Sequence, residues 1–82
     1  MSLRIAYTNN AAVEWRSLSG ERRKAFDQGM EAIARSPYGC GSSPVKGDRD
    51  RRDATVANVA FVTYVVSGSV LTVTVVKLVP LP

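Results

Sequence analysis

The spacing of apolar residues changes along the chain, and the first change separates a short strand from a helix. In "LRIAYT" (residues 3–8) apolar residues alternate with charged or small ones, which is the period of a half-buried β-strand. The following "TNN" supplies side chains that can accept a hydrogen bond from the first turn of a helix. Ala11, Trp15 and Leu18 then recur on one helical face and predict a helix over residues 10–18, with Trp15 as its core anchor.

A second amphipathic helix is predicted after "SLSG". Ser19 is placed as its N-cap, since its hydroxyl can accept from an unpaired backbone N–H of the first turn. The apolar residues Phe26, Met30 and Ile33 form one stripe with helical spacing. The helix is expected to end near Ser36, because a proline follows and disfavours helical geometry in the residue before it.

After this helix the apolar residues no longer recur with the spacing of a helix or a strand. The stretch "SPYGCGSSPVKGD" (residues 36–48) holds three glycines and two prolines and is predicted to be loop. Beyond the charged run that follows, β-branched and aromatic residues dominate the chain. They predict a short strand at about residues 54–58 and two longer strands after it.

The two longer strands are predicted to form a hairpin. Residues 61–66 are apolar on both faces apart from one threonine, as expected of a central strand. "SGS" marks the turn. In the last strand Leu71, Val73 and Val75 alternate with threonines, so this leucine–valine face is expected to lie under the helices. The final "PLP" ends the sheet, because proline cannot donate to a ladder.

The predicted order is therefore β-α-α-β-β-β, an α+β fold in a single domain over residues 1–82. Two helices pack on one face of a largely antiparallel, twisted sheet. No apolar run reaches the roughly 18 residues that a membrane span needs. The start "MSLRIAY" has no hydrophobic core of a signal peptide, which predicts a cytoplasmic protein.

The amino-acid composition excludes several kinds of metal and catalytic site. The chain has no histidine and one cysteine, Cys40, which excludes Cys/His zinc sites and Ser-His or Cys-His nucleophiles. Cys40 has no histidine to activate it and is assigned no role. Eleven Lys and Arg residues against seven Asp and Glu give a net charge of +4. Such an excess attracts phosphate, and it attracts an acidic protein equally well.

The run "KGDRDRRD" (residues 46–53) is the densest charge cluster, with four cations and three carboxylates in eight residues. Two interpretations stay open. The arginines can reach one face and bind phosphate oxygens in pairs, while the aspartates cap turns or pair locally. Alternatively the charges pair with one another in a solvated loop, since each carboxylate repels a phosphate as strongly as an arginine attracts it.

Four segments and the element order resemble the RelE/ParE superfamily of type II toxin–antitoxin toxins. The segments are "TNNAAVEWRSL", "EAIARSPYG", "KGDRDRRDATV" and "FVTYVV". The resemblance implies a bacterial toxin neutralised by a cognate antitoxin that wraps it as a helix or an added strand. RelE-like members are mRNA interferases: they cut messenger RNA at the ribosome without metal and so inhibit translation. ParE-like members block DNA gyrase instead. The resemblance implies no cofactor, no metal and no membrane partner.

Metal-free RNA cleavage by 2′-OH attack needs a base, an acid and cations around the scissile phosphate. On the resemblance, the catalytic candidates are Arg51, Arg52 and Tyr64, with the arginines stabilising phosphate charge. The candidates for binding RNA or a partner protein are Lys46, Arg49, Arg22, Arg23 and Lys77.

Other interpretations of the same residues remain open. A tyrosine on a central strand is commonly core, so Tyr64 has that alternative, and the basic turn "ERRKAF" can be an exposed solubilising turn. The family's third-strand arginine is replaced here by Phe61, and Lys77 is the one cation near the C-terminus. These departures favour the alternative function, a non-catalytic interaction module: a ParE-like gyrase inhibitor or a member that has lost nuclease activity.

Overall fold

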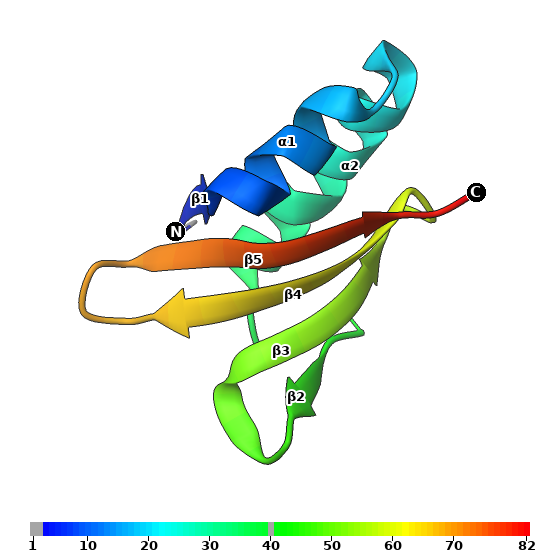
Figure 1. Cartoon of the computed structure of the whole chain (residues 1–82). Helices are drawn as coiled ribbons and strands as arrows, with labels where there is room; N and C mark the ends of the chain where they lie inside the picture. The colour runs from blue at the N-terminus through cyan, green and yellow to red at the C-terminus, as the bar shows by residue number, and fades with distance from the viewer. Residues whose placement is uncertain (1–2, 40) are drawn as a thin grey trace.

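Two helices cover one face of a five-stranded sheet in the computed structural model, which describes residues 3–39 and 41–82 (Figure 1). The α+β class and the packing of both helices on one face are as predicted, whereas Cys40 lies outside the described residues. The elements follow in the order β1 (Arg4–Tyr7), α1 (Asn9–Ser17), α2 (Gly20–Arg35), β2 (Ser43–Val45), β3 (Asp48–Val56), β4 (Ala60–Ser67) and β5 (Thr72–Pro80).

The strands are arranged in the order β1-β5-β4-β3-β2. Only the β1–β5 pair is parallel, so the sheet is mixed and mostly antiparallel. Strand β4 lies in the middle, which explains why residues 61–66 are apolar on both faces.

Both helices begin where the sequence predicts a cap. The Thr8 hydroxyl accepts from the Ala11 backbone N–H at 3.4 Å, and the Ser19 hydroxyl accepts from the Arg22 N–H at 3.4 Å. Helix α2 ends at Ser36, whose N–H closes the last turn before the proline. Local hydrogen-bonding chemistry therefore sets the helix boundaries.

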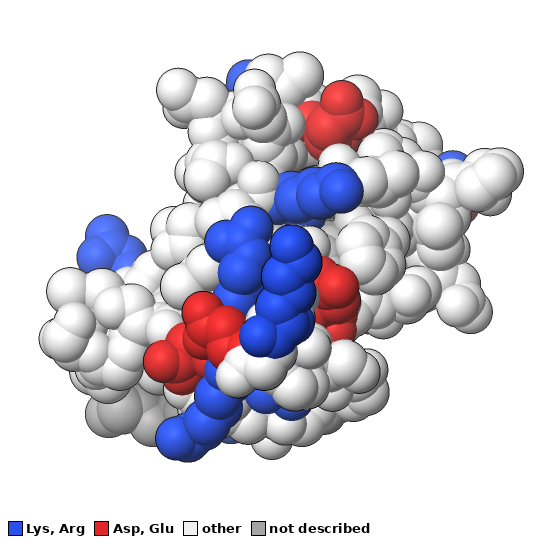
Figure 2. Space-filling view, turned by 60° about the horizontal axis from the view of Figure 1, so that its bottom comes forward, with Lys and Arg blue, Asp and Glu red and all other residues white. Residues whose placement is uncertain are grey.

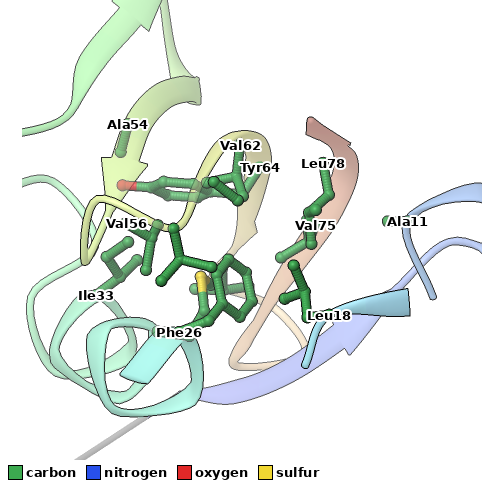
Figure 3. Packing of buried hydrophobic residues seen from close by; sticks show 14 of the residues in the cluster. Ala11, Leu18, Phe26, Ile33, Ala54, Val56, Val62, Tyr64, Val75 and Leu78 are labelled. Atoms are coloured by element: carbon green, nitrogen blue, oxygen red, sulfur yellow. The ribbon is translucent and has the colours of Figure 1, made fainter. Parts of the chain in front are cut away.

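The core lies between α2 and the sheet. The predicted stripe Phe26, Met30 and Ile33 is buried, and Figure 3 shows the Phe26 ring directed from α2 toward the side chains of the sheet. Trp15 is half-buried at the edge of this core. Its ring packs against Tyr7 with a centroid separation of 5.9 Å, and its Nε1–H donates to Asp27 at 2.8 Å. The tryptophan therefore anchors α1 to α2 and β1.

The prediction that residues 36–48 are loop was wrong for Ser43–Val45 and Asp48, which lie in strands, and the start of the next strand was misplaced. Val45 pairs with Asp48 across a two-residue turn, in which Lys46 and Gly47 both have positive φ (51° and 79°). That geometry suits a tight hairpin between twisted strands. The turn creates the extra strand β2, and β3 starts inside the charged run, six residues earlier than the predicted start at Ala54.

Strand β5 departs from strict alternation. Leu71, predicted to face the helices, instead lies in the β4–β5 turn with 55% of its surface exposed. Val73 and Val75 are buried as predicted. An extra residue then interrupts the ladder, because Tyr64 pairs with Val75 but Thr63 pairs with Lys77. Through this bulge Leu78 also reaches the core, although it is an odd number of positions from Val75.

Candidate functional site

The face of the sheet away from the helices carries the exposed charges of the central strands. Successive strand residues point to opposite faces, and Ala54, Val62 and Val75 are buried on the helix side. The residues between them point away from the helices. We call this set the outer face: Arg51, Asp53 and Thr55 of β3; Phe61, Thr63 and Val65 of β4; and Thr74, Lys77 and Val79 of β5. In Figure 2, which brings the lower part of Figure 1 toward the viewer, basic side chains form a band flanked by acidic ones.

Arg51 and Lys77 are the predicted site residues that the structure brings together on the outer face. Both are exposed, and neither side chain has a hydrogen-bond or ion-pair partner among the described residues. Arg51 lies on β3 and Lys77 on β5, with β4 between them. Lys77 is opposite Asp53 rather than Arg51 across the sheet. Two strand spacings sideways and two residues along the strand put the backbones of Arg51 and Lys77 about 12 Å apart. The pair can therefore contact neighbouring phosphates of one nucleic-acid strand or the carboxylates of one acidic peptide.

Between these two cations lies a hydrogen-bonded pair. Thr63 is the register partner of both Asp53 and Lys77, and its hydroxyl donates to an Asp53 carboxylate oxygen at 2.6 Å. Thr63 is only 6% exposed despite its place on the outer face. Asp53 is thus held in position, and it is the one carboxylate among the outer-face residues.

The aspartates of the β2–β3 hairpin bind hydrogen-bond donors other than arginine. Asp48 accepts the backbone N–H of Asp50 at 3.0 Å, and Asp50 accepts the hydroxyl of Tyr38 at 2.7 Å. This hydrogen bond is the main reason that the pKa of Tyr38 is raised. Within the described chain, no ion pair joins these aspartates to the neighbouring arginines. The interpretation in which the charges pair with one another is therefore wrong. The other interpretation holds only in part: Asp48 caps its turn locally, but the arginines do not reach one face, because Arg52 is buried on the helix side.

Tyr38 is a residue of this region that the sequence did not single out. Tyr38 is 39% exposed, and the Arg49 and Arg52 guanidinium groups lie 4.4 Å and 5.5 Å from the centroid of its ring. Both distances are within the range of cation–π attraction. Lys46 lies exposed in the adjoining turn. The tip of the hairpin therefore combines an exposed aromatic ring with two accessible cations, but a tyrosine between a proline and a glycine gives no sequence signal for this.

Arg52 lies on the helix side of the sheet and is 7% exposed. Its Nε donates to the Ser42 hydroxyl at 2.8 Å and its Nη1 to the Arg49 carbonyl at 3.0 Å. Longer bonds from Nη2 reach the Tyr38 and Ser42 carbonyls at 3.3 and 3.4 Å. The guanidinium is thus occupied in tying Tyr38 and Ser42 to the hairpin.

Tyr64, the register partner of Arg52, is completely buried. Its hydroxyl donates to the Pro37 carbonyl at 2.6 Å, so the core alternative describes its position. Arg52 and Tyr64 hold neighbouring residues, Tyr38 and Pro37, from the helix side of the sheet. Their assignment as catalytic residues does not fit this geometry, because neither side chain reaches the outer face.

Arg22 and Arg23 also have internal partners. Arg22 donates to the carbonyls of Leu81 at 2.6 Å and Val59 at 3.0 Å. Arg23 donates to the Leu18 carbonyl at 2.9 Å and the Arg16 carbonyl at 3.0 Å, near the C-terminal end of α1. These bonds explain two cations in the first turn of α2, where the helix dipole disfavours them. Both residues are partly buried, so their predicted role in binding RNA or a partner does not fit the structure.

Neither a metal site nor a membrane span is found in residues 3–39 and 41–82. No three potential ligands among His, Cys, Asp and Glu gather closely enough to hold a metal ion. No helix in this part of the chain has both the length and the apolar character needed to cross a membrane.

Comparison with solved structures shows which proteins share this fold. A chain of the toxin–antitoxin complex RelBE2 from Mycobacterium tuberculosis aligns with a TM-score of 0.80 at 13% identity, covering 99% of this chain and 100% of that one. The isolated E. coli RelE toxin aligns with a TM-score of 0.81 at 17% identity, covering 99% and 86%. A chain of the archaeal RelE–RelB complex from Pyrococcus horikoshii OT3 aligns with a TM-score of 0.74 at 19% identity, covering 98% of this chain and 96% of that one.

No family model matches the sequence, and no curated protein matches it. The resemblance stated from the sequence is thus confirmed at the level of the fold, which is that of RelE-like toxins. Because one of these chains is archaeal, the fold alone does not assign this chain to a bacterium.

Proposed function

We propose that this chain is the toxin of a toxin–antitoxin pair, and that its outer face binds messenger RNA at the ribosome in the cytoplasm. The fold supports the first part, since similar chains were solved in complexes whose names pair RelE with RelB. The observation that carries the second part is the pair Arg51 and Lys77, which are exposed and without partners among the described residues on a face that no helix covers.

This surface suits a single strand of RNA. Arg51 and Lys77 neutralise phosphates, and the partly exposed ring of Phe61 offers a base an aromatic surface on the same face. Lys46 and Arg49 extend the cationic surface to the hairpin tip. If the chain cleaves RNA, Arg51 is the catalytic candidate that can stabilise charge on a scissile phosphate, with Lys77 as the second cation.

A second candidate function is non-catalytic binding, as in a gyrase inhibitor or a toxin that has lost its nuclease. A specific observation favours it. The Tyr64 hydroxyl is bound to the Pro37 carbonyl and the Arg52 guanidinium to Ser42, which leaves no tyrosine on the outer face as defined above. Cleavage would then lack the phenol that the family resemblance implied as a proton donor or phosphate contact.

Induced expression in bacteria, followed by mapping of messenger RNA ends, separates these functions. Growth arrest with new ends at codon boundaries is expected for a nuclease. Arrest with intact messages and altered DNA topology would identify a gyrase inhibitor, and no growth effect would exclude both toxin activities. The variants are Arg51→Ala and Lys77→Ala. Arg35→Ala is the matched control, since Arg35 is an exposed cation on α2. If the control abolishes arrest as fully as the other two, the outer face is not the functional surface.

A further inference from the structure

The exposed aromatic ring of Tyr38 is held in a fixed position beside the β2–β3 hairpin. Its hydroxyl donates to the Asp50 carboxylate at 2.7 Å, and its backbone carbonyl accepts from Nη2 of the buried Arg52 at 3.3 Å. The Gly39 N–H closes the turn around it by donating to the Ser36 carbonyl at 3.0 Å. A side chain restrained at both ends loses little further conformational entropy when a ligand packs on its ring.

Two cations near this ring are available to a ligand. Arg49 is exposed, and its guanidinium lies 4.4 Å from the ring centroid. Neither this guanidinium nor the ammonium group of Lys46, in the turn of the hairpin, has a hydrogen-bond or ion-pair partner among residues 3–39 and 41–82. Cation–π attraction is weak at an exposed position, so Arg49 can leave the ring to bind an anion, while the buried Arg52 keeps the ring in place.

The ring and the cations suit a nucleotide better than an acidic peptide. Residues 46–50 contain two cations and two carboxylates, so the hairpin tip has little general attraction for anions. The carboxylates bind donors of their own region, Asp48 the Asp50 N–H and Asp50 the Tyr38 hydroxyl. A nucleotide adds a flat base that stacks on an aromatic ring, and a phosphate whose oxygens an arginine binds in pairs. A peptide carboxylate would leave the ring unused.

We propose that the tip of the β2–β3 hairpin is a nucleotide-binding site. In this site one base stacks on the Tyr38 ring, and the attached phosphate binds Arg49 and Lys46. The hairpin protrudes at the bottom of the view in Figure 1, so that a ligand can approach it without displacing either helix. Both a nucleotide within an RNA strand and a free nucleotide provide this base and phosphate.

For an RNA strand, the site rests on the proposed function, because the outer face would bind the rest of the strand. Arg51 is two residues from Arg49 along β3, and two residues of extended chain span at most about 7 Å. One strand that contacts Arg51 can therefore continue to the Tyr38 ring. The hairpin tip then adds a stacked nucleotide beyond the phosphates bound on the outer face.

The test compares two substitutions of Tyr38 in the whole chain. Tyr38→Phe and Tyr38→Leu both remove the hydroxyl that is bonded to Asp50, but only Tyr38→Leu removes the aromatic ring. Fluorescence anisotropy with a labelled single-stranded RNA of about ten nucleotides measures the affinity of each variant. Tyr38→Leu is expected to bind at least about fivefold more weakly than the wild type, and Tyr38→Phe within about twofold of it.

The salt dependence separates stacking from charge. Stacking on a ring releases no counterions, so the affinity ratio of wild type to Tyr38→Leu should stay constant between about 50 and about 200 mM salt. Arg49→Gln should instead make the slope of log K against log salt shallower by about 0.7. Arg16→Gln is the matched control, since Arg16 is exposed in the last turn of α1, at the end of the molecule away from the hairpin (Figure 1).

Adenosine monophosphate tests the same site without a strand. Its base is expected to shift the ring proton resonances of Tyr38 and to leave those of the buried Tyr64 unchanged. Affinity similar to that of the RNA would assign the site to a free nucleotide, whereas much tighter binding of the RNA would assign it to a strand.

The nucleotide site is overturned if Tyr38→Leu and Tyr38→Phe bind RNA alike, or if neither ligand shifts the Tyr38 resonances. The double variant Arg51→Gln/Lys77→Gln tests the outer face in the same anisotropy assay. Loss of RNA binding in this double variant but not in Tyr38→Leu overturns the hairpin site and leaves the proposed function standing. Loss in Tyr38→Leu but not in the double variant supports the hairpin site and contradicts RNA binding by the outer face.

Discussion

Arg51 and Arg52 are neighbours in β3, yet their side chains lie on opposite faces of the sheet. Arg52 is buried and bound to Ser42, whereas Arg51 is exposed with no partner among the described residues. Arg52→Gln is expected to lower the free energy of unfolding by about 2–3 kcal/mol, since it removes charge-assisted hydrogen bonds and leaves buried carbonyls unpaired. Arg51→Gln is the matched control and should change it by no more than about 0.5 kcal/mol. Urea unfolding curves of both variants measure the free energy of unfolding. Equal losses would contradict a stabilising role of the buried Arg52 guanidinium.

Tyr7 gives the protein a dependence on alkaline pH. Burial, and secondly the charge of Asp27, raises the pKa of Tyr7 from 10.0 to about 12. The protonated phenol is thus favoured more in the folded than in the unfolded chain. Its contribution to stability is complete below pH 10 and is lost as the pH rises toward 12. The melting temperature of the wild type should therefore fall more steeply across this interval than that of Tyr7→Phe. Parallel curves would show that the Tyr7 phenol is not responsible.

The sequence predicts the location of a side chain correctly only where the local pattern allows a single location. Phe26 and Met30 were placed correctly, because a helical stripe has a single apolar side. Tyr64 and Arg52 were assigned to a catalytic surface on the family resemblance. That assignment does not fit the structure, because a strand puts neighbouring residues on opposite faces and a shift by one residue exchanges them. The partners that decide their face, the carbonyls of Pro37 and Tyr38, lie far away in sequence.

Helix α2 packs closely against β3 at Gly29. A Cβ added there would lie 2.6 Å from the Val56 side chain, so the helix or the strand would have to move. Gly29→Ala is expected to destabilise the fold by about 1–3 kcal/mol through overpacking, although alanine is the better helix former. At Gly20, the first residue of the same helix, an added Cβ has no neighbour within 4 Å. Gly20→Ala should thus be neutral or slightly stabilising in thermal unfolding. A stable Gly29→Ala would mean that α2 does not pack this tightly.

Helices were predictable as elements because their signals are local, as the caps at Thr8 and Ser19 show. Strand β2 was missed because its three residues include Pro44 and carry no period. It exists through the Lys46–Gly47 turn and through pairing with β3. The first half of β3 was predicted as loop because its side chains are charged and exposed. Charged residues near a sheet edge disfavour pairing with strands of other molecules.

The arrangement of the whole molecule follows from having only two layers. Both helices cover one face of the sheet, so the outer face has no layer over it in this chain (Figure 1). The sequence could predict that one face is covered, because the helices are amphipathic. It could not predict which cations lie on the other face, since that depends on the bulge at Val76 and the register of β3. Identities of 13–19% with chains of the same fold show how little sequence these layers share.

The uncovered face predicts how RNA affinity depends on salt. Each phosphate neutralised on a single strand contributes a slope of about −0.7 to log K against log salt, because counterions are released. The double variant Arg51→Gln/Lys77→Gln should therefore bind single-stranded RNA more weakly, with a slope shallower by about 1.4. Fluorescence anisotropy at several salt concentrations measures both quantities. Lys24→Gln/Arg35→Gln removes the same charge from exposed positions of α2, on the other side of the sheet. If binding were only a response to the net charge of +4, both double variants would lose affinity and slope equally. A loss confined to the first variant means that the two strand cations contact phosphate directly.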